Sequence, residues 1–117
     1  MNHTPRLSAA LIRDDFVPKD GFISTEFMRL ENDRMWPKVW QIACREEEIP
    51  NPGDYVTYEI AGEPLIVVRT TPDKIKCFYN VCQHRGRVIK EQPFGSTKFL
   101  YCRYHGWRWT LDGAVSR

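Results

Sequence analysis

The feature that most constrains this chain is a pair of short motifs, each containing one cysteine and one histidine. The first motif reads Cys82-Gln-His84-Arg-Gly86 and the second reads Cys102-Arg-Tyr-His105-Gly-Trp107. Together they offer two thiolates and two imidazoles, which are the side chains that bind zinc and iron–sulfur centres. The chain must therefore fold so that two loops, with residues 85–101 between His84 and Cys102, meet around one metal centre.

Two kinds of metal centre compete for these four side chains: a structural zinc site and a Rieske-type [2Fe–2S] cluster. In a Rieske cluster two histidines replace two cysteines on one of the irons. Zinc fingers usually pair Cys with Cys and His with His along the chain. Here each motif has one of each, which favours both thiolates on one iron and both imidazoles on the other. We expect Gly86 and Gly106 to let the backbone approach the cluster, so that its N–H groups can donate to the sulfides.

Composition and charge exclude several functions. The chain has 117 residues, enough for one domain or part of one, and a formal net charge of only +2, which predicts neither nucleic acid nor membrane as a partner. No apolar run approaches the 18 or so residues of a membrane-spanning helix, and the apolar patch over residues 7–12 is too short for a signal peptide. We expect a cytoplasmic protein whose cysteines stay reduced, with Cys44 and Cys77 as small buried apolar residues.

The local sequence patterns predict a mainly β domain with a short N-terminal helix. Residues 1–21 show no periodicity and are expected to form an arm. Ser24 or Thr25 caps a helix that runs to about Met35, and Trp36 and Trp40 are expected in the core. Short alternating or apolar segments with turns between them then predict antiparallel strands. The expected strands are 40–44, 55–60, 64–70, 75–80, 97–101 and 107–111.

The two metal-binding motifs resemble the paired signatures of the Rieske non-haem iron oxygenases, the aromatic-ring-hydroxylating dioxygenase α subunits and their relatives. The resemblance covers about residue 22 to the end of the chain. Outside the motifs it is carried by Trp40, Ile49-Pro50, residues 52–55, Gly62, residues 67–69 and Asn80-Val81. It implies a Rieske-type iron–sulfur domain over residues 22–117, built of small antiparallel sheets with a two-loop cluster-binding subdomain.

The resemblance also implies the site and its partners. The cluster ligands would be Cys82, His84, Cys102 and His105, and the domain would transfer single electrons. The electrons would come from a reductase or ferredoxin, and other oxygenase subunits would be further partners. By the same resemblance His105 is the candidate through which electrons leave, and Trp107 is expected to pack beneath the cluster. Five cations are expected to make the cluster end basic, which would suit an acidic donor. These are Arg85, Arg87, Lys90, Arg103 and Arg108.

Two positions place the domain within the superfamily. High-potential Rieske proteins resemble this pattern but add one cysteine to each loop, and these two cysteines form a disulfide. Arg87 and Tyr104 occupy the matching positions here, which favours the low-potential branch. That branch includes oxygenase α subunits and small Rieske ferredoxins. The long stretch before Cys82 favours the α subunit, and a free-standing ferredoxin remains the alternative.

The histidine count bears on catalysis. An oxygenase of this family activates O₂ at a mononuclear Fe(II) held by two histidines and a carboxylate. The chain has three histidines, and with His84 and His105 assigned to the cluster only His3 is left. We therefore expect a truncated chain whose catalytic domain, with its Fe(II), is absent and which hydroxylates nothing alone. The sequence does not distinguish aromatic, steroid and quaternary amine substrates.

Overall fold

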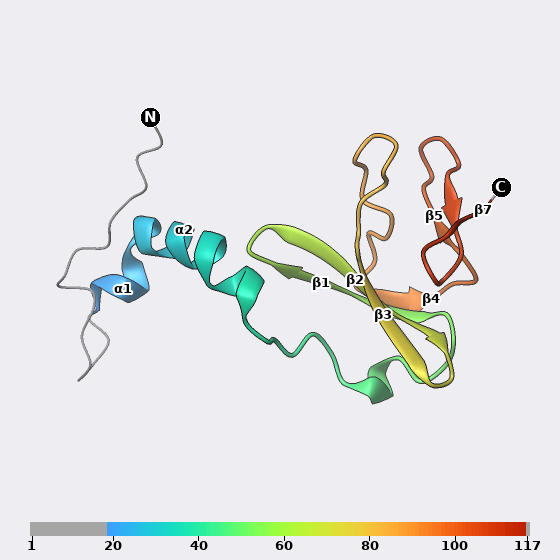
Figure 1. The fold of residues 1–117 in the computed structure, drawn as a ribbon, viewed down its shortest axis with the longest axis horizontal. Coiled ribbons are helices and arrows are strands. Elements are labelled where there is room, and N and C mark those ends of the chain that lie inside the picture. The colour runs from blue at the N-terminus through green and yellow to red at the C-terminus, as the bar shows by residue number, and fades with distance from the viewer. Residues whose placement is uncertain (1–18, 117) are drawn as a thin grey trace. The chain divides into compact units, whose positions relative to one another are not determined.

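Figure 1 shows the computed structural model of the chain, which describes residues 19–116. The chain divides into two compact units, one over residues 1–40 and one over residues 41–117. The arm predicted for residues 1–21 lies almost entirely outside the described residues. His3 lies there too.

The first unit contains the predicted helix. A short helix α1 (Asp20–Ile23) precedes α2 (Thr25–Arg34). The Ser24 side chain accepts a hydrogen bond from the backbone N–H of Phe27 at 3.1 Å, which satisfies one of the free donors at the start of α2. Leu30 is the buried residue of this helix, and the predicted cap at Ser24 is confirmed. No helix among residues 19–116 is long and apolar enough to cross a membrane.

The two tryptophans after the helix lie outside the core. A proline at position 37 disfavours helical backbone at Trp36, and a 3₁₀ turn, η2 (Trp36–Lys38), follows α2. Trp36 is half-buried and Trp40 is fully exposed, so the prediction that Trp40 packs in the core was wrong. The strand expected over residues 40–44 does not form either. Without a strand there, no sheet face carries the Trp40 ring into a core.

The second unit consists of two antiparallel sheets, which confirms the predicted mainly β class. In the larger sheet the strand order is β3-β2-β1-β4, and in the smaller it is β5-β6-β7. The larger sheet contains β1 (Asp54–Ile60), β2 (Glu63–Thr71), β3 (Lys74–Tyr79) and β4 (Phe94–Ser96). The smaller sheet contains β5 (Leu100–Tyr101), β6 (Arg108–Trp109) and β7 (Val115–Ser116). A turn η3 (Glu46–Glu48) precedes β1.

The core of this unit lies on one face of the larger sheet. Strand register places Tyr55 opposite Val68 and Ile66 opposite Phe78, so these side chains share that face. They form one buried cluster with residues of the smaller sheet and of the two loops. Its other buried members are Cys82, Leu100, Cys102 and Trp109. The two motif cysteines are thus part of the hydrophobic core.

The sequence predicts a single strand over residues 97–101. In the structure this region contains the turn that follows β4 and then the start of β5. β4 ends at Ser96, and β5 begins at Leu100. Between them the Thr97 hydroxyl donates to the carbonyl of Phe99 at 2.7 Å, and the Thr97 N–H donates to Gly53 at 2.9 Å. These bonds turn the chain away from one sheet and into the other, which a pattern of alternating residues does not reveal.

The cysteines outside the motifs are less buried than expected. Cys77 is exposed and Cys44 is half-buried, so the prediction that both are buried was wrong. Cys77 lies on the edge strand β3 and pairs with Val67, on the face of the sheet opposite the core. Its neighbour Phe78 is the residue that packs against the core.

Asn80 closes the base of the first motif loop. Its side chain is buried, with 3% of its surface exposed. The Asn80 amide Nδ2 donates to the carbonyl of Lys90 at 2.7 Å, and the Lys90 N–H donates to Asn80 Oδ1 at 2.8 Å. One side chain therefore holds both ends of the segment 81–89 together.

Replacing Asn80 tests this closure. Asn80→Ala leaves the Lys90 N–H and carbonyl without their partner, and we expect it to lower the free energy of unfolding by about 2–4 kcal/mol. The matched control Asn51→Ala changes an exposed asparagine of a turn and should cost less than about 0.5 kcal/mol. Urea unfolding measures both. Equal stability of the two variants would contradict the proposed closure.

Candidate metal centre

The two motifs fold into loops with the same backbone hydrogen bonds. In the first, the Cys82 N–H donates to Arg87 at 2.7 Å and the Gly86 N–H donates back to Cys82 at 2.8 Å. In the second, the Cys102 N–H donates to Trp107 at 2.8 Å and the Gly106 N–H donates back to Cys102 at 3.0 Å. Figure 1 shows the loops as two neighbouring fingers, one after β3 and one between β5 and β6. Each finger begins at a buried cysteine.

Glycine is required in both loops by the backbone conformation. Gly86 has a φ of +73° and Gly106 a φ of +79°, in the left-handed region that other residues rarely adopt. A Cβ added at Gly86 would meet no atom within 4 Å. The positive φ therefore explains why this position is a glycine. A lack of space among the residues of the chain does not explain it.

The two thiols meet in the core. Cys82 and Cys102 are 3% and 2% exposed and belong to the same buried cluster. Burial raises the pKa of Cys102, but the backbone N–H groups of Tyr104 and His105, the Cys82 side chain and the charge of Arg87 lower it, and the net shift is downward. The thiolate is the form that binds a metal, so these donors favour the ligating state.

The two imidazoles meet at the surface. His84 and His105 are exposed, and their ring centroids lie 4.6 Å apart in an edge-on arrangement at 76°. Trp107 stacks on His84, with centroids 5.1 Å apart and planes within 9°. The ring centroids of Tyr104 and His105 lie 3.9 Å apart. Each imidazole is therefore oriented by an aromatic ring of the second loop.

The histidines occupy different positions of two otherwise equivalent loops. His84 is the second residue after its cysteine, whereas His105 is the third. Arg85 stands in the first loop where His105 stands in the second. The loops consequently present their imidazoles from different points of the same backbone turn.

The four candidate ligands come together as two pairs. The thiols are in contact inside the core and the imidazoles are in contact at the surface. Among residues 19–116, no three His, Cys, Asp or Glu side chains are gathered around a single point as for one ion. Two donors for each of two irons are what a Rieske-type [2Fe–2S] cluster requires, so the chemistry of this donor set fits that group.

The five cations near the loops, which the sequence predicts to form one basic end, differ in their exposure and in their partners. Arg85, Arg87 and Arg103 are exposed, and Arg87 forms an ion pair with Glu91 at 3.2 Å. Lys90 and Arg108 are half-buried. The Arg108 guanidinium lies over the ring of Phe99, 4.7 Å from its centroid.

Sequence reasoning missed the part that Tyr104 and Asn80 play. The sequence singles out Tyr104 only as the position of an absent cysteine. An aromatic residue directly before His105 was nevertheless a signal for a contact between the two rings. Asn80 was noted only as part of the resemblance. A signal for its role in closing the loop was available, because an asparagine stands directly between a strand and a loop with candidate ligands.

Comparison with known proteins agrees with this geometry. Residues 39–117 match the family described as Rieske [2Fe-2S] domain. The chain is 36% identical over 109 residues to the anthranilate 1,2-dioxygenase large subunit of Acinetobacter baylyi, covering 86% of this chain and 23% of that protein. It is also 36% identical over 100 residues to the carnitine monooxygenase oxygenase subunit of Escherichia coli K12, covering 86% and 27%.

Solved structures give the same result. A naphthalene 1,2-dioxygenase from Rhodococcus sp. bound to indole matches with a TM-score of 0.80 at 32% identity, covering 86% of this chain and 23% of that one. The quaternary ammonium Rieske monooxygenase CntA matches with a TM-score of 0.78 at 30% identity, covering 86% and 28%.

The chain spans about a quarter of the length of these relatives. The family match favours the [2Fe–2S] cluster over zinc, and the relatives are oxygenase subunits, which does not favour a free-standing ferredoxin. The chain therefore belongs to the Rieske [2Fe–2S] domain family, in the form found in the α subunits of Rieske oxygenases.

Proposed function

We propose that this domain holds a Rieske [2Fe–2S] cluster and passes single electrons through it. Cys82 and Cys102 would hold one iron, and His84 and His105 the other. The observation that carries the proposal is the sorting of donors by depth, with buried thiols in contact and exposed imidazoles in contact. When bound, the cluster supplies a one-electron couple.

The surroundings of the four residues support a direction for the electron. The thiols are enclosed by the core, so no partner can approach them closely. The imidazoles reach the surface, where a partner can contact them. By its resemblance to the family, His105 is the residue through which electrons would leave, and the Tyr104 ring against it limits its rotation.

The charges near the loops support an acidic electron donor. Arg85, Arg87 and Arg103 are exposed and lie within or directly after the two motif loops. Complementary charge steers association and lowers the chance of wrong partners. A reductase or ferredoxin with an acidic surface fits this end of the domain, and other oxygenase subunits would be further partners, as the relatives suggest.

The role in a whole oxygenase follows from the relatives. Residues 22–117 would be the Rieske domain, residues 1–21 an arm, and a catalytic domain beyond the given residues would hold the mononuclear Fe(II). The oxygenase would act on an aromatic or related substrate in the cytoplasm. The relatives' names include anthranilate, carnitine and naphthalene.

Substitution of the ligands tests the assignment. Cys82→Ser, Cys102→Ser, His84→Ala and His105→Ala should each abolish the cluster, because each removes one of the two donors of one iron. Iron and acid-labile sulfide are measured after anaerobic reconstitution.

Cys44→Ser and Cys77→Ser are the matched controls. Both residues lie outside the core and outside the loops, so these variants should bind normal amounts of iron and sulfide. A normal cluster in His84→Ala would show that the assignment is wrong.

The aromatic rings of the second loop bear on the reduction potential. Hydrogen bonds to the sulfides and cysteine sulfurs stabilise the reduced cluster and raise its potential. Trp107 offers no hydroxyl, and its ring stacks on His84. Tyr104 is 55% exposed and packs on His105. Because position 107 offers no hydroxyl to donate to the sulfides, we expect the potential to lie near the low end of the Rieske range, at about −150 mV.

A pair of substitutions at Trp107 isolates the effect of a hydroxyl. Trp107→Ser and Trp107→Ala both remove the stack on His84, but only the first adds a donor. We expect the Ser variant to have the higher potential, by about 60 mV for each tenfold gain in stabilisation of the reduced state. Protein-film voltammetry measures both. A wild-type midpoint above zero, or equal midpoints in the two variants, would contradict this account.

A further inference from the structure

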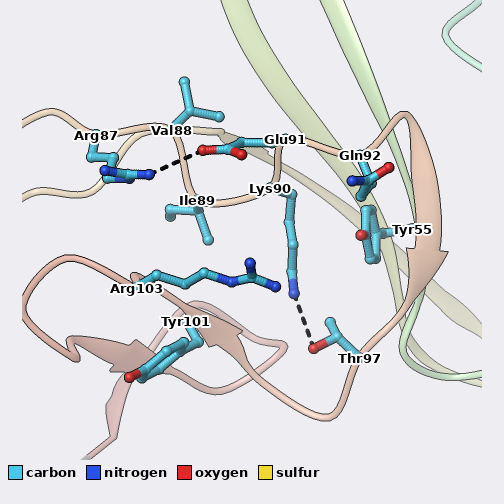
Figure 2. Close-up of a pocket in the computed structure, with 10 residues that line it drawn as sticks. All are labelled: Tyr55, Arg87, Val88, Ile89, Lys90, Glu91, Gln92, Thr97, Tyr101 and Arg103. Carbon is cyan, nitrogen blue, oxygen red and sulfur yellow. Dashed lines mark hydrogen bonds and ion pairs between the residues drawn. The ribbon is translucent and has the colours of Figure 1, made fainter.

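A cavity of about 240 Å³ lies beside the two motif loops. Figure 2 shows it between the segment after the first loop, the second loop and Tyr55 of β1. Its volume is below the 300–1,000 Å³ typical of drug-sized ligands. It therefore has room for a small molecule or ion.

Two cations face each other across this cavity. The Lys90 ammonium and the Arg103 guanidinium point into the same space in Figure 2. Burial lowers the pKa of Lys90, and the positive charge of Arg103 lowers it further. Two like charges held in one partly enclosed space repel each other, and an anion between them would remove that repulsion.

The part of the chain that the structure describes supplies no anion for this pair. The one carboxylate lining the cavity, Glu91, forms its ion pair with Arg87. Among residues 19–116, no carboxylate lies within ion-pair distance of Lys90 or Arg103. The cavity thus has two cations directed into it whose charges are not neutralised by those residues.

The surrounding groups hold the Lys90 side chain in place. Its ammonium donates to the Thr97 hydroxyl oxygen at 3.2 Å and lies 5.2 Å from the centroid of the Tyr55 ring. Thr97 is itself fixed, because its hydroxyl donates to the Phe99 carbonyl. Tyr55 is 5% exposed. The ammonium is therefore preorganised at the cavity, which reduces the entropy lost on binding.

We propose that this cavity is a binding site for a small oxyanion, held between the Lys90 ammonium and the Arg103 guanidinium. Phosphate and carboxylate groups share the chemistry that such a pair recognises. The site lies next to the metal centre but uses none of its four ligands. Lys90 follows the first loop and Arg103 is the residue after Cys102, so a bound anion would join the two loops.

Calorimetric titration of the reconstituted protein tests the site. Phosphate and acetate are titrated separately at constant ionic strength, with sodium chloride as the balancing salt. We expect one saturable site per chain for at least one of the two anions. Stronger binding of phosphate would identify a tetrahedral ligand, and stronger binding of acetate a carboxylate; either result supports the proposal.

Three charge-removing variants locate the site. Lys90→Gln and Arg103→Gln should each weaken binding at least about tenfold, since each removes a charge-assisted hydrogen bond. Lys98→Gln is the matched control, because Lys98 is exposed nearby and does not line the cavity. It should bind the anion as the wild type does.

Several results would overturn the proposal. These are no binding above the chloride background, unchanged affinity in Lys90→Gln, or equal weakening in Lys98→Gln. Lys90→Gln keeps the backbone bonds to Asn80, so it serves if Arg103→Gln fails to fold. The heat of binding does not depend on which residues hold the cluster, so failure here and failure of the ligand assignment are separate results.

Discussion

The burial of Cys82 and Cys102 between two sheets is the constraint on which the rest of the β-rich unit depends. Their side chains pack with Tyr55, Ile66 and Val68 of the larger sheet and with the smaller sheet. The metal centre and the hydrophobic core are therefore one structure. Because the thiols must lose their protons to bind a metal, binding is coupled both to folding and to pH. Without a bound metal, the loops would be held by their backbone bonds, the Asn80 side chain and apolar contacts.

The offset of the two histidines makes the imidazoles unequal, although the loops share one hydrogen-bond pattern. His84 lies flat against Trp107, whereas His105 meets Tyr104 at 47°. The Trp107 stack covers one face of His84. A partner that touches both imidazoles would therefore meet two different surroundings. The two loops share one backbone pattern, and the offset distinguishes their two exposed imidazoles.

Much of the site was predictable because its chemistry is local in sequence. The Cys–His spacing, the glycines with positive φ and the Ser24 cap each depend on a few neighbouring residues. The failures concern contacts between distant segments. Alternation at residues 75–80 does not say which face meets the core, so the expectation that Cys77 is buried was wrong. The Thr97 turn depends on a bond to Gly53, and the exposure of Trp40 depends on a strand that does not form.

Lys90 links the fold, the metal centre and the oxyanion site. Its backbone is held by Asn80, which closes the first loop, and its ammonium lies in the cavity beside Arg103 of the second loop. Exposed charges near the cluster are screened by salt and act weakly on it. A half-buried ammonium such as Lys90 is screened less by water and salt than an exposed guanidinium at the same distance. An anion bound between Lys90 and Arg103 would therefore act on a charge that the fold partly encloses and that lies between the two motif loops.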